Sequence, residues 1–294
     1  METELPAGTL YIVGTPIGNL EDMTFRAVRI LQTVQVIAAE DTRHTGKLLQ
    51  HFQIQTPQVS YHDHNRQQRL PQLLQRLCEG EAIALVTDAG MPGISDPGYE
   101  LVNACVEAGV SVVPIPGPSA GITALCAAGL PTDRFVFEGF LPPKGQERKQ
   151  RLDALSCETR TIIFYEAPHR VRQTLTDFAA VMGSERQVVL GRELTKRYEE
   201  FWRGTLGEAI AHYQEREPQG EFTLVVAGAE FVTPMLSEAA LKSELEQLLH
   251  QGLTRSQASR QLAQQTSLPR RQIYQLALAI PEMMNPEVSA LEAD

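Results

Sequence analysis

Residues 10–19 have the sequence LYIVGTPIGN, in which an apolar run at residues 10–13 is followed directly by a segment rich in glycine and proline. A short apolar run that stops at such a segment indicates a buried β-strand followed by a tight loop. The pattern returns at residues 82–86, where the run ends at the loop 88–93, and again at residues 110–115. Because helical patterns separate these runs, the first half of the chain is predicted to form a mostly parallel sheet with helices on its faces.

The second half of the chain repeats this alternation, beginning at residues 135–140. Beyond Gly228 the composition changes, and after a predicted linker at residues 232–237 two short helices are expected, the second opening near residue 267. They resemble a helix-turn-helix unit, although a small helical appendage or a dimer contact explains them equally well. The predicted fold class is α/β, with α/β domains at residues 1–131 and 132–230, a small C-terminal helical domain at 231–281, and a disordered tail at 282–294.

Composition and charge restrict the class of function. The chain of 294 residues has a net charge of −10, so any contact with nucleic acid relies on local basic stretches such as residues 144–151 and 242–271. No apolar run approaches the ~18 residues that span a bilayer, and the acidic N-terminus lacks the features of a signal peptide. The four cysteines lie far apart, and His62 and His64 lack a third ligand, so no metal site is predicted. We expect a cytoplasmic protein with no membrane partner.

Polar side chains follow the predicted strands at their carboxyl ends, where ligands bind in parallel sheets. Asp88 lies at one strand end and suits a ribose or a positive centre, whereas Asp96, just ahead of Pro97, is interpreted as a helix cap or turn residue. Residues 40–43 place two carboxylates and a guanidinium at another strand end, where the arginine either binds phosphate or only pairs with its neighbour. Taken alone, the loop at residues 14–19 is equally well explained as a tight turn.

Seven sequence motifs occur in a fixed order, and together they identify a protein family much more specifically than any one motif does. Together they resemble the tetrapyrrole-methylase superfamily of S-adenosylmethionine (SAM) enzymes over residues 9–228, and within it the branch that modifies ribosomal RNA; residues 254–278 are similar to the helical domain of that branch. The motifs are GTPIGNL at 14–20, AEDTR at 39–43, DAGMP at 88–92, SDPG at 95–98, PGPSA at 116–120, FYEAPHR at 164–170 and RELTK at 192–196. Small-molecule members usually carry G-x-G-P-G-D and G-G-D loops, which this sequence replaces at residues 14–19 and 86–88, so a tetrapyrrole substrate is in doubt.

The resemblance implies a fold, a cofactor and a reaction. It implies SAM folded into a cleft between two α/β domains, a homodimer, and 2′-O-methylation of a cytidine ribose in the decoding region of small-subunit (16S) ribosomal RNA, which makes that RNA or the ribosomal subunit the expected partner. The rival interpretations are a SAM-dependent tetrapyrrole (precorrin-like) methyltransferase and, from another class, a ligand-sensing DNA-binding regulator. The residues that match SAM contacts of the superfamily are Ile17, Thr87, Asp88, Met91, Ser119, Ala120, Glu166, Ala167 and Leu194.

Methyl transfer to a hydroxyl group requires alignment of the reacting atoms and a nearby base. We predict that Glu40 or Asp41 is the base and that Arg43 and Lys196 contact a phosphate or the 2′-oxygen. His169 and Arg170 are predicted to lie in the first turn of a helix, where cations oppose the helix dipole. Their presence there favours a functional role over a structural one. RNA is recognised largely through phosphates and 2′-hydroxyl groups. The predicted RNA contacts are His169, Arg170, Arg255, Arg270 and Arg271.

Overall fold

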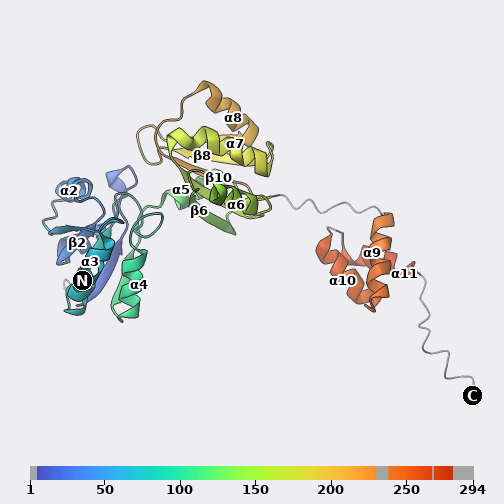
Figure 1. The fold of residues 1–294 in the computed structure, drawn as a ribbon, viewed down its shortest axis with the longest axis horizontal. Coiled ribbons are helices and arrows are strands. Elements are labelled where there is room, and N and C mark those ends of the chain that lie inside the picture. The colour runs from blue at the N-terminus through green and yellow to red at the C-terminus, as the bar shows by residue number, and fades with distance from the viewer. Residues whose placement is uncertain (1–4, 230–237, 267, 281–294) are drawn as a thin grey trace, which may run out of the picture. The chain divides into compact units, whose positions relative to one another are not determined.

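The computed structural model describes residues 5–229, 238–266 and 268–280. The chain divides into two compact units, Met1–Ala229 and Glu230–Asp294. The first unit contains two five-stranded sheets, and helices make up the second (Figure 1). The predicted linker at 232–237 and the predicted tail at 282–294 lie outside the described residues. The predicted domain boundaries after residues 131, 230 and 281 stay predictions.

The first sheet has the strand order β3-β2-β4-β1-β5, and every neighbouring pair is parallel, as predicted. Strand β1, which lies between β4 and β5, is buried at all five positions, which explains its continuous apolar run. The strands are β1 (Thr9–Val13), β2 (Val36–Ala39), β3 (Gln58–Ser60), β4 (Ile83–Val86) and β5 (Ser111–Ile115). The helices that follow them are α1 (Phe25–Thr33), α2 (Thr42–His51), α3 (Arg66–Cys78), α4 (Tyr99–Glu107) and α5 (Ala120–Ala128), with a 3-10 turn η1 (Leu20–Asp22).

Two residues of types that often cap helices, Thr24 and Asn65, precede helices in this half of the unit. The Thr24 side chain accepts a hydrogen bond from the Ala27 amide and caps α1, as its position before an apolar stripe predicts. Asn65 precedes α3 but does not cap it, because its side chain instead accepts from the His62 amide and donates to Ser60. A side chain that bonds to the preceding loop is no longer available to the helix.

The second sheet has the order β6-β7-β10-β8-β9 and differs from the first in strand direction. Only β6 and β7 are parallel, whereas β10 runs antiparallel to both β7 and β8, and β8 runs antiparallel to β9. Its strands are β6 (Phe135–Phe140), β7 (Thr161–Glu166), β8 (Gln187–Arg192), β9 (Glu200–Thr205) and β10 (Phe222–Val226). Its helices are α6 (Gln146–Leu155), α7 (Val171–Met182) and α8 (Leu206–Glu215), with the 3-10 turn η2 (Pro168–Arg170).

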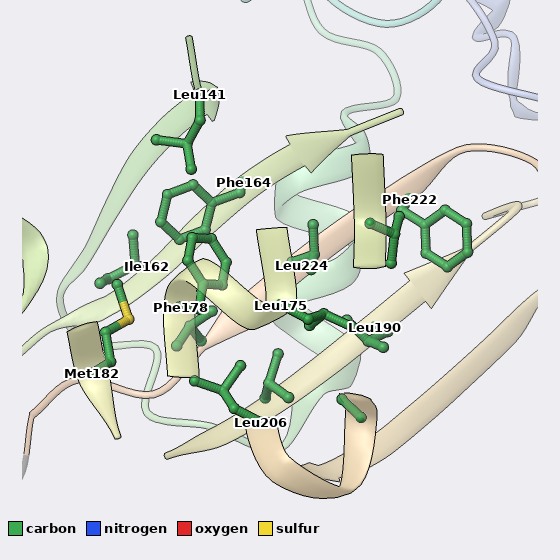
Figure 2. Close-up of a cluster of buried hydrophobic side chains, with 14 of the residues drawn as sticks. Leu141, Ile162, Phe164, Leu175, Phe178, Met182, Leu190, Leu206, Phe222 and Leu224 are labelled. Atoms are coloured by element: carbon green, nitrogen blue, oxygen red, sulfur yellow. The ribbon is translucent and has the colours of Figure 1, made fainter. Parts of the chain in front are cut away.

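One face of the second sheet carries the largest hydrophobic core of the unit. Phe164 of β7 packs against Phe178 of α7, and Leu190 and Leu224 complete the contact between strands and helix (Figure 2). The opposite face is covered by α5, whose Ala124 and Leu125 cluster with Ile163 of β7 and with strands β8 and β10. Helix α5 therefore follows the last strand of the first sheet in sequence but packs on the second sheet.

The C-terminal unit consists of α9 (Glu238–His250), α10 (Arg255–Gln265) and α11 (Arg270–Leu278) in its described part. Leu245, Leu262 and Ile273, one from each helix, are buried together. Thr254 and Gln257 form a capping box at the start of α10. Within the described residues, no helix is long and apolar enough to cross a membrane.

Candidate active site

A cavity of about 340 Å³ lies where loops of the first sheet meet strand ends of the second. Small-molecule sites are concave, mostly apolar, and supplied with a few polar groups, and this cavity has that character. Its first wall comes from the loops after β1, β4 and β5, and its second wall from the ends of β6, β7 and β10. The residues predicted to contact SAM that line it are Ile17, Met91, Ser119, Ala120, Glu166, Ala167 and Leu194.

Backbone contacts hold the three loops of the first wall together. Thr15 and Gly90 form a β-bridge with hydrogen bonds of 2.9 and 3.0 Å between their amides and carbonyls. The buried Thr15 hydroxyl donates to the Thr87 carbonyl at 3.1 Å. A Cβ atom at Gly14 would lie 2.7 Å from the Cα atom of Gly117, so the loops after β1 and β5 approach closely only because both residues are glycine. Gly14 of the motif GTPIGNL and Gly117 of the motif PGPSA are therefore required by the close packing of these loops beside the cavity.

The second wall is fixed by a buried ion pair. Glu166 is 2 % exposed, and its Oε1 atom lies 3.1 Å from Nε of Arg170. Its Oε2 atom accepts a hydrogen bond of 2.6 Å from the Thr174 hydroxyl. The Arg170 guanidinium also donates to the Leu141 carbonyl at 2.6 Å. Arg170 was predicted to contact RNA. In the structure its side chain contacts Glu166 and the Leu141 carbonyl at the end of the second sheet, and the RNA contact stays a prediction.

Tyr165 adds an aromatic surface beside this ion pair. Its ring packs edge-on against Phe137 and Phe140, with centroids 5.1 and 5.6 Å away. The Tyr165 hydroxyl accepts a hydrogen bond of 3.0 Å from the amide of Gly121 at the start of α5. Burial raises the pKa of Tyr165, so the phenol stays protonated at neutral pH. Phe140 lines the cavity and remains half exposed.

Lys196 lies outside the cavity wall, between two carboxylates. Its Nζ atom is 3.0 Å from Glu193 and 3.1 Å from Glu221, and Glu221 itself lines the cavity. Burial alone lowers the pKa of Lys196, but the two carboxylates outweigh it and the pKa lies above the ordinary value, so the side chain stays charged. The lysine stem packs where a side chain at Gly18 would otherwise lie. Its predicted contact with a substrate oxygen stays a prediction.

The loop after β2 carries the predicted base candidates and lies away from the cavity wall. Asp41 accepts from the Arg43 amide at the start of α2, and its Oδ2 atom is 2.7 Å from the Arg43 guanidinium, which is 89 % exposed. This hydrogen-bonded pair holds the pKa of Asp41 far below its ordinary value. Burial raises the pKa of the neighbouring Glu40. Neither carboxylate lines the cavity, and their catalytic roles stay predictions.

Thr87 and Asp88 lie directly behind the first wall. The Asp88 carboxylate accepts from the Asp41 amide at 3.3 Å, and the Asp88 amide donates to Glu40 at 3.4 Å. Asp88 thus ties the ends of β2 and β4 together. The two residues predicted with it as SAM contacts of the same loop, Thr87 and Met91, divide, since Met91 lines the cavity and Thr87 does not.

Asp96 is the site residue that the sequence misplaced. It was interpreted as a helix cap or turn residue ahead of Pro97. Because α4 begins at Tyr99 and its N-cap is Gly98, the cap interpretation is wrong, and Asp96 lies in the bend that precedes the helix. Asp96 is half-buried and lines the cavity. Burial raises its pKa to about 7, helped by the charges of Glu40, Asp88 and Asp63 and opposed by a hydrogen bond from Thr87. The motif SDPG contained the signal, but only its place beside the cavity separates it from a cap.

The remaining basic residues predicted to bind RNA lie on two surfaces. His169 is exposed in η2, next to the cavity's second wall. In the C-terminal unit, Arg270 and Arg271 are exposed at the start of α11, and Arg270 donates to the Ser256 hydroxyl at 2.9 Å. Arg255 donates to the Ile280 carbonyl at 2.8 Å. Within the described ranges, no group of His, Cys, Asp or Glu side chains has the arrangement of a metal site.

Comparisons with known proteins agree on one family. The sequence profile of the tetrapyrrole (corrin/porphyrin) methylases matches residues 9–210. A protein of Synechocystis sp. named "Ribosomal RNA small subunit methyltransferase I" is 63 % identical over 274 residues, which cover 93 % of this chain and 98 % of that protein. A protein of the same name from Halalkalibacterium halodurans is 49 % identical and covers 92 % of this chain and 94 % of its own length. A solved uroporphyrin-III C-methyltransferase from Thermus thermophilus, complexed with S-adenosylhomocysteine, has a TM-score of 0.53 at 18 % identity over 74 % of this chain and 96 % of that structure, which shows a shared fold.

Proposed function

Because the chain belongs to the tetrapyrrole methylase family, we propose that it is a SAM-dependent methyltransferase whose substrate is the RNA of the small ribosomal subunit. The observation that carries the proposal is the likeness to the ribosomal RNA methyltransferases, which extends over nearly the whole chain and includes the C-terminal unit. The likeness to the solved uroporphyrin-III C-methyltransferase covers a smaller share of the chain, 74 %, at 18 % identity. A substrate smaller than RNA would leave the second unit, with its exposed arginines, without a role.

The residues around the cavity fit the proposed cofactor. SAM combines an adenine ring with a sulfonium and an ammonium cation, and the cavity combines apolar surface from Ile17, Met91 and Leu194 with nearby carboxylates. The close approach of Gly14 and Gly117 leaves backbone rather than side chains at the cavity edge, which suits a ligand held by peptide groups. When bound, SAM supplies an electrophilic methyl group. The protein's own contribution is to hold the acceptor oxygen in line, exclude water and take up a proton.

We further propose that the acceptor is the 2′-oxygen of a cytidine ribose in the decoding region. A protein enzyme that modifies one nucleotide in a structured region of RNA must move that nucleotide out of its stack. Stacking of the base on an aromatic side chain compensates part of the energetic cost. Phe140 offers such a surface at the cavity, half exposed and braced by Tyr165. We place the reaction in the cytoplasm with the ribosomal subunits, and the homodimer implied by the resemblance stays a prediction.

The decisive test is incubation with methyl-labelled SAM and small subunits that lack the modification. We expect label on one cytidine ribose, located by nuclease digestion and mass spectrometry, and no label on uroporphyrinogen or precorrin substrates. Replacing Ala120 by Trp, which fills the cavity, should abolish SAM binding in calorimetry and remove the label. Ala127→Trp, on an exposed part of the same helix α5, is the matched control and should retain SAM binding. Label on a tetrapyrrole would reverse the assignment of substrate.

The C-terminal unit gives a separate test of RNA binding. Each phosphate contact by a cation lowers the slope of log affinity against log salt by about 1. Combined Arg270→Ala and Arg271→Ala should therefore weaken RNA binding at low salt and make its salt dependence less steep by about 2. SAM affinity should not change, because neither arginine lines the cavity. An unchanged salt slope would remove the RNA role of these two residues.

A further inference from the structure

Among the described residues, Asp96 is the one cavity-lining carboxyl group that forms no ion pair; the hydrogen bond from Thr87 is its polar contact. Three other ionisable side chains line the cavity. Glu166 is engaged with Arg170 and Thr174, and Glu221 forms an ion pair with Lys196. The third, Tyr165, keeps its proton at neutral pH. No Lys, Arg or His among the described residues forms an ion pair with Asp96, and the charges that act on its pKa, those of Glu40, Asp88 and Asp63, are all negative.

The loop around Asp96 is held in a conformation that random loops avoid. Ser95 has a φ of 61°, which is unfavourable for a residue with a side chain, and Gly98 has a φ of 148°. Ser95 packs against β6, where a Cβ atom at Gly139 would lie 2.9 Å from its hydroxyl oxygen. Pro97 is buried next to them. Strain of this kind persists where surrounding structure fixes it, so the loop places the Asp96 carboxyl against the cavity from a rigid base.

The groups that face Asp96 come from three strand ends of the first sheet and one of the second. Glu40 follows β2, Asp63 follows β3 and Asp88 follows β4, and each adds negative charge. From the second sheet, Tyr165 lies close enough that Asp96 contributes to its raised pKa. The combined effect of burial and negative charge brings the pKa of Asp96 to about 7. A general base works best when its pKa lies near the working pH, because it is then both available and basic.

We propose that Asp96 is the general base that accepts the proton of the ribose 2′-hydroxyl, an assignment that rests on the proposed function. The hydroxyl proton passes to a carboxylate oxygen of Asp96, and a lone pair of the 2′-oxygen forms the new bond to the methyl carbon. The bond between that carbon and sulfur breaks with its electron pair on sulfur. The products are the 2′-methoxy ribose and S-adenosylhomocysteine, and Asp96 then releases its proton to water.

A different role for this carboxylate is to attract the positive charges of SAM, and affinity separates the two. Asp96→Asn keeps the size of the side chain and removes its basicity. A base makes its contribution in the transition state, so the variant should lose about 10²- to 10⁴-fold in single-turnover methyl transfer to small subunits at saturating SAM. Its dissociation constant for SAM, measured by calorimetry, should stay within about threefold of wild type. A carboxylate that binds the cofactor would instead raise that constant by the larger factor.

Two readouts connect the loss of rate to the titration of this group. Carbon-13 NMR of labelled aspartate carboxyls in the unmodified protein should show one signal titrating near pH 7 that is absent in Asp96→Asn. The wild-type rate should fall about tenfold per pH unit below that value, because only the carboxylate accepts a proton, and the residual rate of the variant should not follow this limb. Asp96→Glu, which restores a carboxylate, should recover part of the rate.

Matched variants make each outcome decisive. Asp153→Asn changes an exposed aspartate of α6 and should leave rate and pH profile unchanged. The assignment is overturned if Asp96→Asn transfers methyl at the wild-type rate, or if Glu40→Gln or Asp41→Asn removes the pH limb while Asp96→Asn keeps it. Wild-type protein that binds SAM but labels no ribosomal RNA would instead reject the proposed function, and the role of Asp96 with it.

Discussion

Asp41 in the loop after β2 and Asp96 in the loop after β4 lie at the same edge of the first sheet, yet their surroundings move their carboxyl pKa values in opposite directions. In the loop after β2, Asp41 has Arg43 two residues away, and the hydrogen-bonded pair keeps the pKa of Asp41 low. In the loop after β4, Asp96 is influenced by three carboxylates and forms no ion pair with a cation of the described residues, and its pKa rises to about 7. Residue type and position at a strand end are therefore shared by an exposed ion pair and a carboxyl group with a raised pKa.

The raised pKa of Asp96 depends on the backbone conformation of the loop after β4. The largest expected effect on stability therefore comes from a substitution that disturbs this conformation. Gly98→Ala places a Cβ atom 3.0 Å from Leu85 and 3.1 Å from the Gly93 amide, at a φ of 148°. Strain and crowding together should cost about 2–4 kcal/mol of unfolding free energy in urea titrations. Gly109→Ala, at the other end of α4 with a φ of 70° and open space around it, should cost only about 1 kcal/mol. Equal losses would show that the loop around Asp96 is not sterically fixed.

The next effect sharpens the comparison through pH. An acid whose folded-state pKa is raised binds more protons folded than unfolded, so wild-type stability should decline as pH rises from about 4 to 7. Asp96→Asn removes this penalty and should stabilise the protein by about 1–2 kcal/mol at pH 8, well under the full shift because the carboxyl is partly exposed. At pH 4 the gain should vanish. Asp41→Asn should change stability little at either pH, because the ion pair of Asp41 with Arg43 is exposed and screened by solvent. Unfolding curves at both pH values decide.

A smaller effect concerns Glu40, which connects the two loops. Its charge is the largest electrostatic contribution to the raised pKa of Asp96 after burial. Glu40→Gln should therefore lower the pKa of Asp96, and carboxyl NMR should show the signal titrating at a lower pH. Asp133→Asn, an exposed residue between the sheets in sequence, serves as control and should leave that signal in place. An unmoved Asp96 signal in Glu40→Gln would mean that burial alone sets its pKa.

The smallest effect is expected for the exposed pair itself. Arg43→Ala should let the pKa of Asp41 rise toward its ordinary value, which NMR titration can follow. The urea midpoint should not change measurably, because exposed ion pairs are screened by water and salt. Lys47→Ala, one turn later on α2, provides a control for loss of positive charge and should leave the Asp41 titration unchanged. A clear fall in the urea midpoint for Arg43→Ala, but not for Lys47→Ala, would show that the ion pair between Asp41 and Arg43 does stabilise the loop after β2.

Much of the fold follows from the sequence because its signals are local. Buried parallel strands such as β1 are continuous apolar runs, and the capping box at Thr254 is set by two residues three apart. The short edge strand β3 has only Val59 as an apolar residue, and its three positions are half-buried, so it gives no such signal. The direction of β10 is also invisible locally, since an antiparallel strand with both faces covered has the same apolar run as a parallel one.

The site was predictable as far as its loops and less so in its chemistry. Glycine motifs locate the cavity, because close backbone approach leaves a mark in the sequence at Gly14 and Gly117. The sequence does not show which carboxylate has the raised pKa, since that depends on charges that are far apart in the chain. Asp63 and Asp96 lie more than thirty residues apart and meet only when β3 and β4 are placed in one sheet. A pKa is a property of the assembled surroundings, and the sequence shows only the residue type.

Helix α5 has a practical consequence for dividing the protein. Its Ala124, Leu125 and Ala128 are covered by strands of the second sheet rather than by the sheet that precedes it in the chain. A truncated protein ending at residue 131 would carry α5 with its apolar side uncovered, and we expect it to aggregate. Ending the fragment at residue 118 leaves that helix with the partner it packs on. The two halves of this enzyme should therefore be expressed with the cut before α5 rather than at the boundary after residue 131 that the sequence predicts.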